Sequence, residues 1–212
     1  RLENMTAKKQ AFYLLSFLDS LWPQLMGNRL ARLYRARHIG EGYGIPTISM
    51  KTRYGHLSFS CPSRLALIRA QTLFSKEPDT IQWIEKHIHK NAERKIFWDI
   101  GANIGCYSLF AGLNKQTRVF AFEPSGANYF ILLRNIYGNN LRNVTPVSCA
   151  VTGQSFFSHL SLKNLDMAEG GHQFREKSAL KNNSVLSQDG FHEGCFGYSI
   201  DDLVKIHNFE VP

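Results

Sequence analysis

FWDIGANIG, residues 97–105, is the stretch that decides the fold, because an apolar run meets two closely spaced glycines there. The run from Ile96 to Ile100 has the composition of a strand in the core of a parallel sheet. Gly101 and Gly105 carry no side chain, so the backbone can approach a ligand closely. A helical pattern of apolar residues follows and directs its N-terminal amides back at the turn. The stretch therefore predicts a strand, a nucleotide-binding turn and a helix.

The spacing of this turn separates two kinds of cofactor. Nicotinamide and flavin sites favour G-x-G-x-x-G, whereas here Asp99 comes two residues before Gly101 and Asn103 takes the middle position. Asparagine tolerates the left-handed backbone that such a turn needs. A second predicted strand, residues 118–122, leads to Glu123, which lies 22 residues after Gly101, where an acid would bind both ribose hydroxyls. Together the two signals favour S-adenosylmethionine.

A third predicted strand, residues 144–149, completes what can be counted of the parallel sheet. Ligands of open parallel sheets bind outside the carboxyl ends of the strands, so Pro124 and Ala150 are further candidates for cofactor contact. No acid follows the third strand, so adenine would be bound there by backbone and apolar groups. The fold class expected is α/β, a Rossmann-like doubly wound sheet of which only the first half is present.

Three strings of the sequence resemble the FkbM-type methyltransferases. They are FWDIGANIGCYSL, VFAFEPSGANYFILLRNI and NVTPVSCAV, and the similarity runs roughly from residue 72 to residue 204. The resemblance implies S-adenosylmethionine as cofactor and O-methylation of sugar or polyketide hydroxyls. It implies cofactor contact from Asp99, Gly101, Ala102, Asn103, Gly105 and Glu123. It also gives Glu77 a role beside the methionine ammonium group, for which simple helix capping is the alternative.

Composition bounds the partners of the chain. Among 212 residues, 25 Lys and Arg against 17 Asp and Glu give a formal charge of +8. Nucleic acid, acidic lipid or a phosphorylated substrate would fit this charge, but the bases are scattered, so a solvated basic surface is the simpler interpretation. The four cysteines lack C-x-x-C spacing, which is typical of reduced cytoplasmic thiols. His159, His172 and His192 lack the spacing of metal ligands, so no metal is predicted.

Three regions are expected along the chain. Residues 1–45 predict a helical extension, whose apolar part is too short to span a membrane. We expect it to pack on the catalytic domain or on an oligomer partner, and a helix lying on acidic lipid is the weaker alternative. Residues 46–90 predict a hairpin around Tyr54 and Gly55 and then two helices. Residues 91–212 predict the cofactor domain, in which 153–194 form one strand and a long loop, either a lid or a surface insertion, and 198–206 a helix.

The sequence thus predicts a cytoplasmic S-adenosylmethionine-dependent methyltransferase acting on a hydroxyl of a sugar, glycan or similar small acceptor. We expect the general base to come from strands beyond residue 212, so no catalytic residue is named and the chain alone is expected to be inactive. One alternative is a nucleic-acid methyltransferase, which only the charge favours. The other is a non-catalytic cofactor-binding fragment. The oligomeric state is not predicted.

Overall fold

The computed structural model describes residues 45–90, 93–162, 164, 166–174 and 191–212. The chain divides into two units, Arg1–Pro46 and Thr47–Pro212, and the second contains the elements described below. The helices predicted within residues 1–45 lie outside the described residues. In the described part of the chain, no helix has the length and the hydropathy that a membrane crossing requires.

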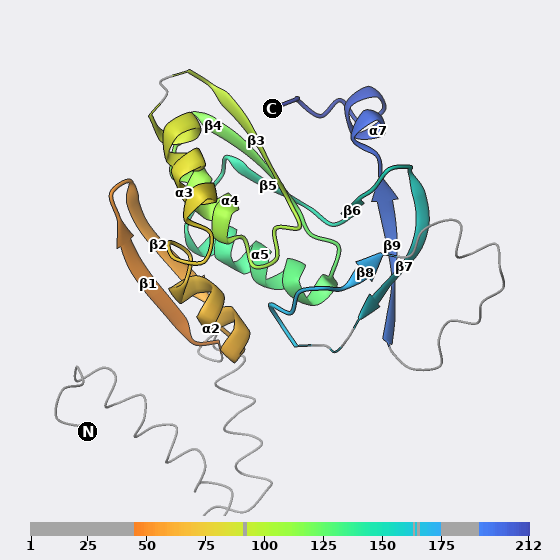
Figure 1. Ribbon diagram of the computed structural model, residues 1–212, viewed down its shortest axis with the longest axis horizontal. Helices are drawn as coiled ribbons and strands as arrows, with labels where there is room; N and C mark the ends of the chain where they lie inside the picture. Colours follow the sequence, from red (N-terminus) through yellow and green to blue (C-terminus); the bar gives the residue numbers. More distant parts are fainter. Residues whose placement is uncertain (1–44, 91–92, 163, 165, 175–190) are drawn as a thin grey trace, which may run out of the picture. The chain divides into compact units, whose positions relative to one another are not determined.

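A parallel sheet of three strands forms the centre of the second unit (Figure 1). Its order is β3-β4-β5, and its strands are Lys95–Ile100, Thr117–Phe122 and Val144–Val147. Helix α4, Cys106–Gly112, connects the first pair, and α5, Gly126–Gly138, connects the second. The strand β4 is buried along almost its whole length, as its β-branched and aromatic composition predicts. The predicted α/β fold is confirmed, and the strand order is that of one half of a doubly wound sheet.

A hairpin packs against α5. Its strands, β1 (Thr47–Thr52) and β2 (Gly55–Ser60), pair in antiparallel fashion as predicted. The outer edge of β2 has no strand beside it among the described residues, and an asparagine of α5 and the asparagine that caps its C-terminus bind it instead. The amides of Ser60 and Ser58 each donate over 2.7 Å to the side-chain oxygen of an asparagine, Asn135 and Asn139 respectively. Side chains of α5 and of its C-cap thus satisfy backbone groups that a neighbouring strand would otherwise bind.

Two helices connect the hairpin to β3. The first, α2 (Arg64–Gln71), is capped by Ser63, whose Oγ accepts a hydrogen bond from the amide of Ala66 over 3.1 Å. The second, α3 (Pro78–Ile84), begins at a proline, as predicted, and continues as a π-helical turn, η1 (Glu85–His89). Both helices lie where the apolar periodicity of the sequence places them.

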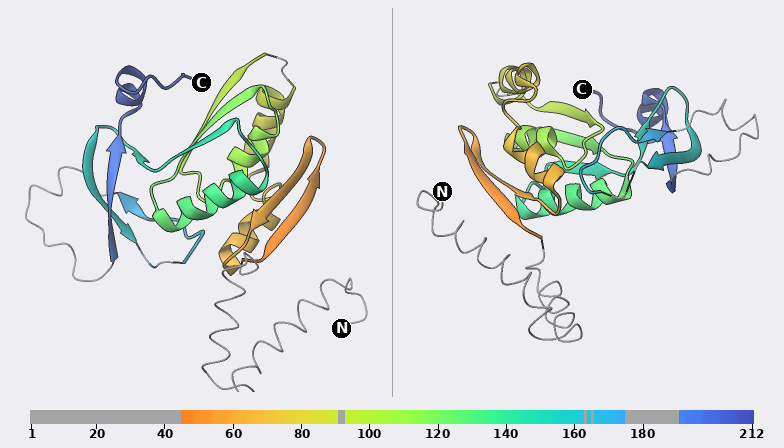
Figure 2. Two further views of the ribbon diagram at one scale, coloured as in Figure 1. Left: turned by 180° about the vertical axis from the view of Figure 1, so that it is seen from behind. Right: turned by 60° about the horizontal axis from the view of Figure 1, so that its bottom comes forward.

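A second sheet follows β5 (Figure 2). Its order is β6-β9-β7-β8, and its strands are Ala150–Val151, Phe191–Tyr198, Phe156–Leu162 and Gln173–Phe174. The predicted strand at 156–162 is confirmed, but the loop predicted up to residue 194 and the helix predicted from 198 are wrong where β9 runs. The polar composition of residues 153–194 predicted a loop, whereas β9 contains two glycines that pack against aromatic rings. A Cβ at Gly194 would come within 3.0 Å of the Phe157 ring, and one at Gly197 within 2.7 Å of the Phe174 ring.

The end of the chain packs on the first sheet. After β9 comes α7, Ile200–Lys205, shorter than the predicted helix. The ring of Phe209 then lies 4.8 Å from that of Phe120 and 6.0 Å from that of Trp98, centroid to centroid. The indole nitrogen of Trp98 donates to the carbonyl of Glu210 over 2.9 Å. These contacts hold residues 209–210 against β3 and β4.

Candidate functional site

The turn between β3 and α4 lies across the carboxyl end of β4. The amides of Gly101 and Ala102 both donate to the carbonyl of Phe122, each over 2.9 Å. Gly101 has a φ of 77° and Asn103 a φ of 53°, so both adopt the left-handed backbone. The prediction that Asn103 tolerates this conformation is confirmed. The turn therefore presents its backbone at the edge of the sheet where ligands of parallel sheets bind.

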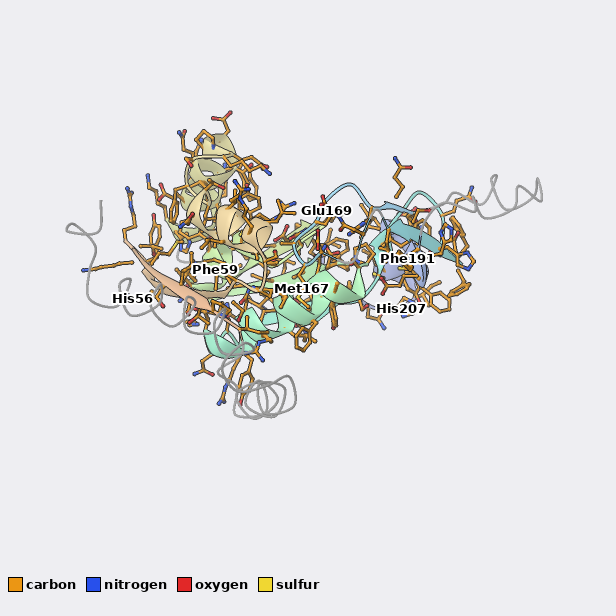
Figure 3. All side chains as sticks on the ribbon, turned by 90° about the horizontal axis from the view of Figure 1, so that it is seen from below. His56, Phe59, Met167, Glu169, Phe191 and His207 are labelled. Carbon is orange, nitrogen blue, oxygen red and sulfur yellow. The ribbon has the colours of Figure 1, made fainter. Side chains whose placement is uncertain are left out.

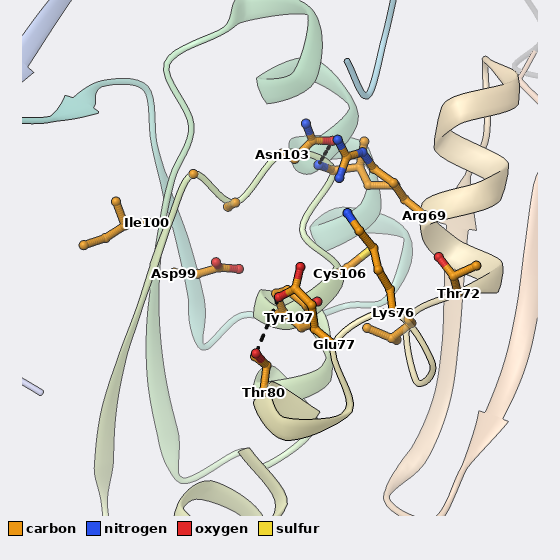
Figure 4. Close-up of a pocket in the computed structure, with 14 residues that line it drawn as sticks. Arg69, Thr72, Lys76, Glu77, Thr80, Asp99, Ile100, Asn103, Cys106 and Tyr107 are labelled. Carbon is orange, nitrogen blue, oxygen red and sulfur yellow. Dashed lines mark hydrogen bonds between the residues drawn. The ribbon is translucent and has the colours of Figure 1, made fainter. Parts of the chain in front are cut away.

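A cavity of about 340 Å³ opens at this turn (Figure 4). Of the predicted cofactor residues, it is lined by Glu77, Asp99, Gly101, Ala102 and Asn103. The sequence did not point to the other residues that line it, which are Arg69, Thr72, Leu73, Lys76, Thr80, Ile100, Ile104, Cys106 and Tyr107. Several of these come from α2 and the start of α3, which only the packing of the chain brings to the turn. The four remaining candidates do not line the cavity.

Asp99 is a buried acid whose two oxygens differ in their contacts. Only 9% of the residue is exposed, and its Oδ2 accepts from the amide and the hydroxyl of Ser108, over 2.9 Å and 2.6 Å. Within the described residues, Oδ1 receives no hydrogen bond. Burial raises the pKa of Asp99, the bonds from Ser108 oppose that rise, and the negative charge of Glu77 adds to it. Asp99 thus holds the first turn of α4 with one oxygen and leaves the other for a ligand.

Charges of opposite sign meet in this cavity without pairing. Figure 4 shows the amino group of Lys76 and the guanidinium of Arg69 on the Asn103 side, away from the carboxylates of Glu77 and Asp99. No ion pair within the described residues joins these cations to these acids.

Glu77 does not act as a helix cap here. It occupies the N-cap position of α3, yet its side chain accepts no capping hydrogen bond from the backbone. Its carboxylate instead accepts from the Thr80 hydroxyl over 3.5 Å. Burial raises the pKa of Tyr107, and so does the contact with Glu77. The capping alternative is therefore not realised by the Glu77 side chain.

Glu123 lies behind the turn rather than in the cavity. It is 4% exposed, and its Oε2 accepts from the amide of Asn103 over 2.8 Å. Its Oε1 accepts from the amide of Ser125 over 3.0 Å and from the side chain of Asn128 over 3.4 Å. Burial raises the pKa of Glu123, and these three donors oppose the rise. The carboxylate touches the turn through the Asn103 amide, and both of its oxygens are already bonded to protein donors.

Gly105 and Ala150 serve packing. A Cβ at Gly105 would lie 2.6 Å from Leu132 and 2.7 Å from Leu109, so its missing side chain lets α4 and α5 approach. Ala150 lies in β6 and is buried against apolar side chains of the second sheet, namely Leu160, Leu162 and Cys195. Pro124 is half-buried after β4. Gly101 differs from Gly105, because a Cβ built there meets no atom within 4 Å.

The cysteines of the chain are protonated thiols or buried side chains rather than disulfide partners. All four cysteines are free, and burial raises the pKa of Cys106, beside the turn, to about 12, which keeps it protonated. Among the described residues, no group of three or more His, Cys, Asp or Glu is arranged to hold a metal ion.

Comparison with family models finds no match, and comparison with curated proteins finds none either. Among solved structures, the precorrin-6y C5,15-methyltransferase of Geobacter metallireducens is 26% identical over 38% of this chain and 42% of that one, with a TM-score of 0.32. TYW2 of M. jannaschii, in complex with AdoMet, is 22% identical over 48% and 42%, with a TM-score of 0.33. Coclaurine N-methyltransferase, bound to N-methylheliamine and SAH, is 11% identical over 70% and 49%, with a TM-score of 0.34.

The chain thus spans less than half the length of each of these proteins. Neither these structures nor the other comparisons confirm the FkbM family. At such TM-scores the likeness carries no weight for the site, so the function is argued from the cavity itself.

Proposed function

We propose that this protein binds S-adenosylmethionine at the turn after β3 and belongs to a methyltransferase. The observation that carries the proposal is the pattern of charge in the cavity, where no ion pair among the described residues joins the cations Lys76 and Arg69 to the acids Glu77 and Asp99. The methionine end of S-adenosylmethionine is a zwitterion, so its carboxylate would bind the cations and its ammonium group the acids. The space beside Gly101 leaves room for the ligand to approach the backbone.

The adenosine end would extend toward Glu123. Its carboxylate bonds to the Asn103 amide, so it lies next to the cavity wall, and ribose binding stays our proposal for it. Pro124 stays a candidate for adenine contact. The side chain of Ala150 is engaged in the second sheet, so only its backbone would be available to adenine.

When bound, S-adenosylmethionine supplies an electrophilic methyl group. The residues described here would bind the cofactor and orient that methyl group, so that an acceptor approaches in line with the bond that breaks. We propose a hydroxyl of a sugar, glycan or similar small molecule as the acceptor, on the strength of the sequence resemblance alone. We assign no general base to a described residue.

A nucleic-acid acceptor is a second candidate, and one observation favours it. A depression of about 370 Å³ lies at the amino ends of the three parallel strands. Four basic residues line it, namely Arg94, Lys115, Arg118 and Arg142. Glu210 pairs with two of them, Arg94 at 2.9 Å and Arg118 at 3.1 Å. The remaining positive charge would suit phosphate groups.

Isothermal titration calorimetry with two ligands tests the proposed cofactor. S-adenosylhomocysteine has the amino-acid end, and 5′-methylthioadenosine lacks it. We expect the first ligand to bind at least tenfold more tightly than the second. Lys76→Gln and Glu77→Gln should each weaken S-adenosylhomocysteine by roughly tenfold or more, since a hydrogen bond to a charged group contributes about 1.5–3 kcal/mol. Neither variant should change the affinity for 5′-methylthioadenosine.

Lys115→Gln is the matched control, because it removes a positive charge at the other end of the sheet. It should leave both affinities unchanged. Absence of S-adenosylhomocysteine binding would refute the cofactor assignment. Equal affinity for the two ligands would refute the role of the charged cavity.

A further inference from the structure

Residues 166–171, here called the cover segment, lie against α5 and the turn after β3. The carbonyl of Glu169 accepts two hydrogen bonds, from the side-chain amide of Asn103 over 2.9 Å and from that of Asn128 over 3.0 Å. The amide of Ala168 donates to the side-chain oxygen of Asn128 over 2.7 Å. Figure 3 labels Met167 and Glu169 on this segment, and the bonds to Asn128 place it beside α5.

The other side of the cover segment is held by the start of α2 and its last turn. The hydroxyl of Ser63 donates to the carbonyl of Met167 over 2.6 Å. The Nε of Arg69 donates to the carbonyl of Ala168 over 2.7 Å. The side chain of Ala168 is fully buried between these contacts. The segment thus bridges α2 and α5 across the turn.

This arrangement closes the approach to Glu123. The two residues that bond the Glu169 carbonyl, Asn103 and Asn128, are also donors to the Glu123 carboxylate. Glu123 is only 4% exposed and is not part of the cavity wall. A ribose could not reach its oxygens while the cover segment is docked in this way. Arg69, one of the two cations of the cavity, is engaged by the same segment.

The docked conformation is also strained at one residue. Ala168 has a φ of 71°, in the left-handed region where side chains other than glycine and asparagine are disfavoured. The five hydrogen bonds above hold the residue there. Strain of this kind is found at ligand clamps and switch segments, where two conformations are close in free energy.

We infer that the cover segment is a displaceable lid, which releases Glu123 and Arg69 when the cofactor binds. The inference rests on the proposed function, because it concerns the ribose of the same ligand. Docking of the segment and binding of the ribose at Glu123 exclude one another. The apparent affinity for the cofactor is therefore reduced by the fraction of molecules in which the segment is docked.

Two substitutions at Ala168 shift this balance in opposite directions. Ala168→Gly removes the cost of the left-handed backbone, so it should favour docking and weaken S-adenosylhomocysteine by about fivefold. Ala168→Val places a β-branched side chain at the same φ in a fully buried position, so it should disfavour docking and tighten binding. Asn140→Gly is the control, because Asn140 has a φ of 50° and lies away from the turn, beside the apolar depression next to α5. It should leave the affinity unchanged.

Amide hydrogen exchange of the unaltered protein gives a second readout that no variant can compromise. The Ala168 amide, bonded to Asn128, should be protected without ligand and exchange faster with saturating S-adenosylhomocysteine. Affinity changes of opposite sign in Ala168→Gly and Ala168→Val, together with faster exchange of the Ala168 amide in the presence of the ligand, support the lid. Any other pattern of affinities, or an Ala168 amide that stays protected in the presence of the ligand, would mean that the cover segment does not move and would overturn the inference. Ligand binding by the unaltered protein would still uphold the proposed function. If no variant binds the ligand, the proposed function is wrong and the lid falls with it.

Discussion

Asp99 and Glu123 are both buried acids at the carboxyl ends of neighbouring parallel strands, yet their surroundings differ. Asp99 has one oxygen bonded to Ser108 and lines an open cavity. Glu123 has three donors on its two oxygens and lies beneath the cover segment. The same sequence signal, an acid where a strand ends, therefore marks two different groups. The Asp99 carboxylate faces the cavity, and the Glu123 carboxylate is buried behind the turn. The motif shows which residues gather, and the packing decides which of them a ligand can reach.

The largest difference is expected between the two glycines of the turn, Gly101 beside the open cavity and Gly105 packed against α5. Gly105→Ala would press a methyl group against Leu109 and Leu132 at a φ of 88°, so we expect a loss of about 2–5 kcal/mol in the free energy of unfolding. Gly101→Ala meets open space, so only the backbone cost of about 1–2 kcal/mol applies, and the added methyl should weaken S-adenosylhomocysteine. Urea denaturation and calorimetry on both variants measure this. Equal losses of stability would contradict the difference between the two positions.

Side-chain donors on the two acids give the next largest contrast. Asn128→Ala leaves the Ala168 amide without its acceptor and takes one donor from Glu123, so it should cost about 2–3 kcal/mol. Ser108→Ala removes only the hydroxyl donor to Asp99, because the backbone amide stays, and should cost about 1 kcal/mol. Urea denaturation of the two variants checks the order. A larger loss for Ser108→Ala would mean that the open side is the more tightly held.

Much of the fold could be predicted from the sequence, because its signals are local. The parallel strands, the turn with Asn103 left-handed, the hairpin and the start of α3 at Pro78 follow from composition and spacing. The second sheet could not be predicted in full, because Gly194 and Gly197 are typical of loops and their role depends on rings from other strands. Of the candidate site residues, those in one stretch of sequence, Asp99 and Gly101 to Asn103, lie together at the cavity. Arg69 and the cover segment were missed, because contacts with partners about 100 residues away in the chain place them.

The pH dependence of stability should reflect both acids. Burial raises the pKa of Asp99 and of Glu123, so as pH rises through their ordinary values the folded protein releases these protons later than the unfolded chain does. Their contribution to stability is therefore lost as pH rises above their ordinary values of 3.8 and 4.5. Asp99→Asn removes one of these titrations. Between pH 4 and pH 7 we expect the variant to gain stability relative to the unaltered protein, by about 1.4 kcal/mol for each unit of pKa shift removed.

Asp202 provides the control of opposite sign. Hydrogen bonds from Ser155 and Ser199 lower its pKa, so its contribution is present at neutral pH and lost as pH falls. Asp202→Asn should therefore lose stability relative to the unaltered protein as pH rises. Urea denaturation at a series of pH values gives all three curves. Parallel curves for Asp99→Asn and the unaltered protein would show that Asp99 does not titrate abnormally.

The smallest expected effect concerns how the second sheet supports the closed side. Glu193 of β9 accepts from the amide of Gly126, the first residue of α5, over 2.9 Å and 3.2 Å with its two oxygens. A carboxylate at a helix N-terminus contributes about 0.3–1 kcal/mol, and Glu193→Gln keeps an acceptor while removing the charge. We expect a loss in that range and faster amide exchange at Gly126, two residues before the Asn128 that bonds the cover segment. Unchanged exchange at Gly126 would mean that α5 begins where it does without help from β9, and that the closed side is held by the cover segment and α2 alone.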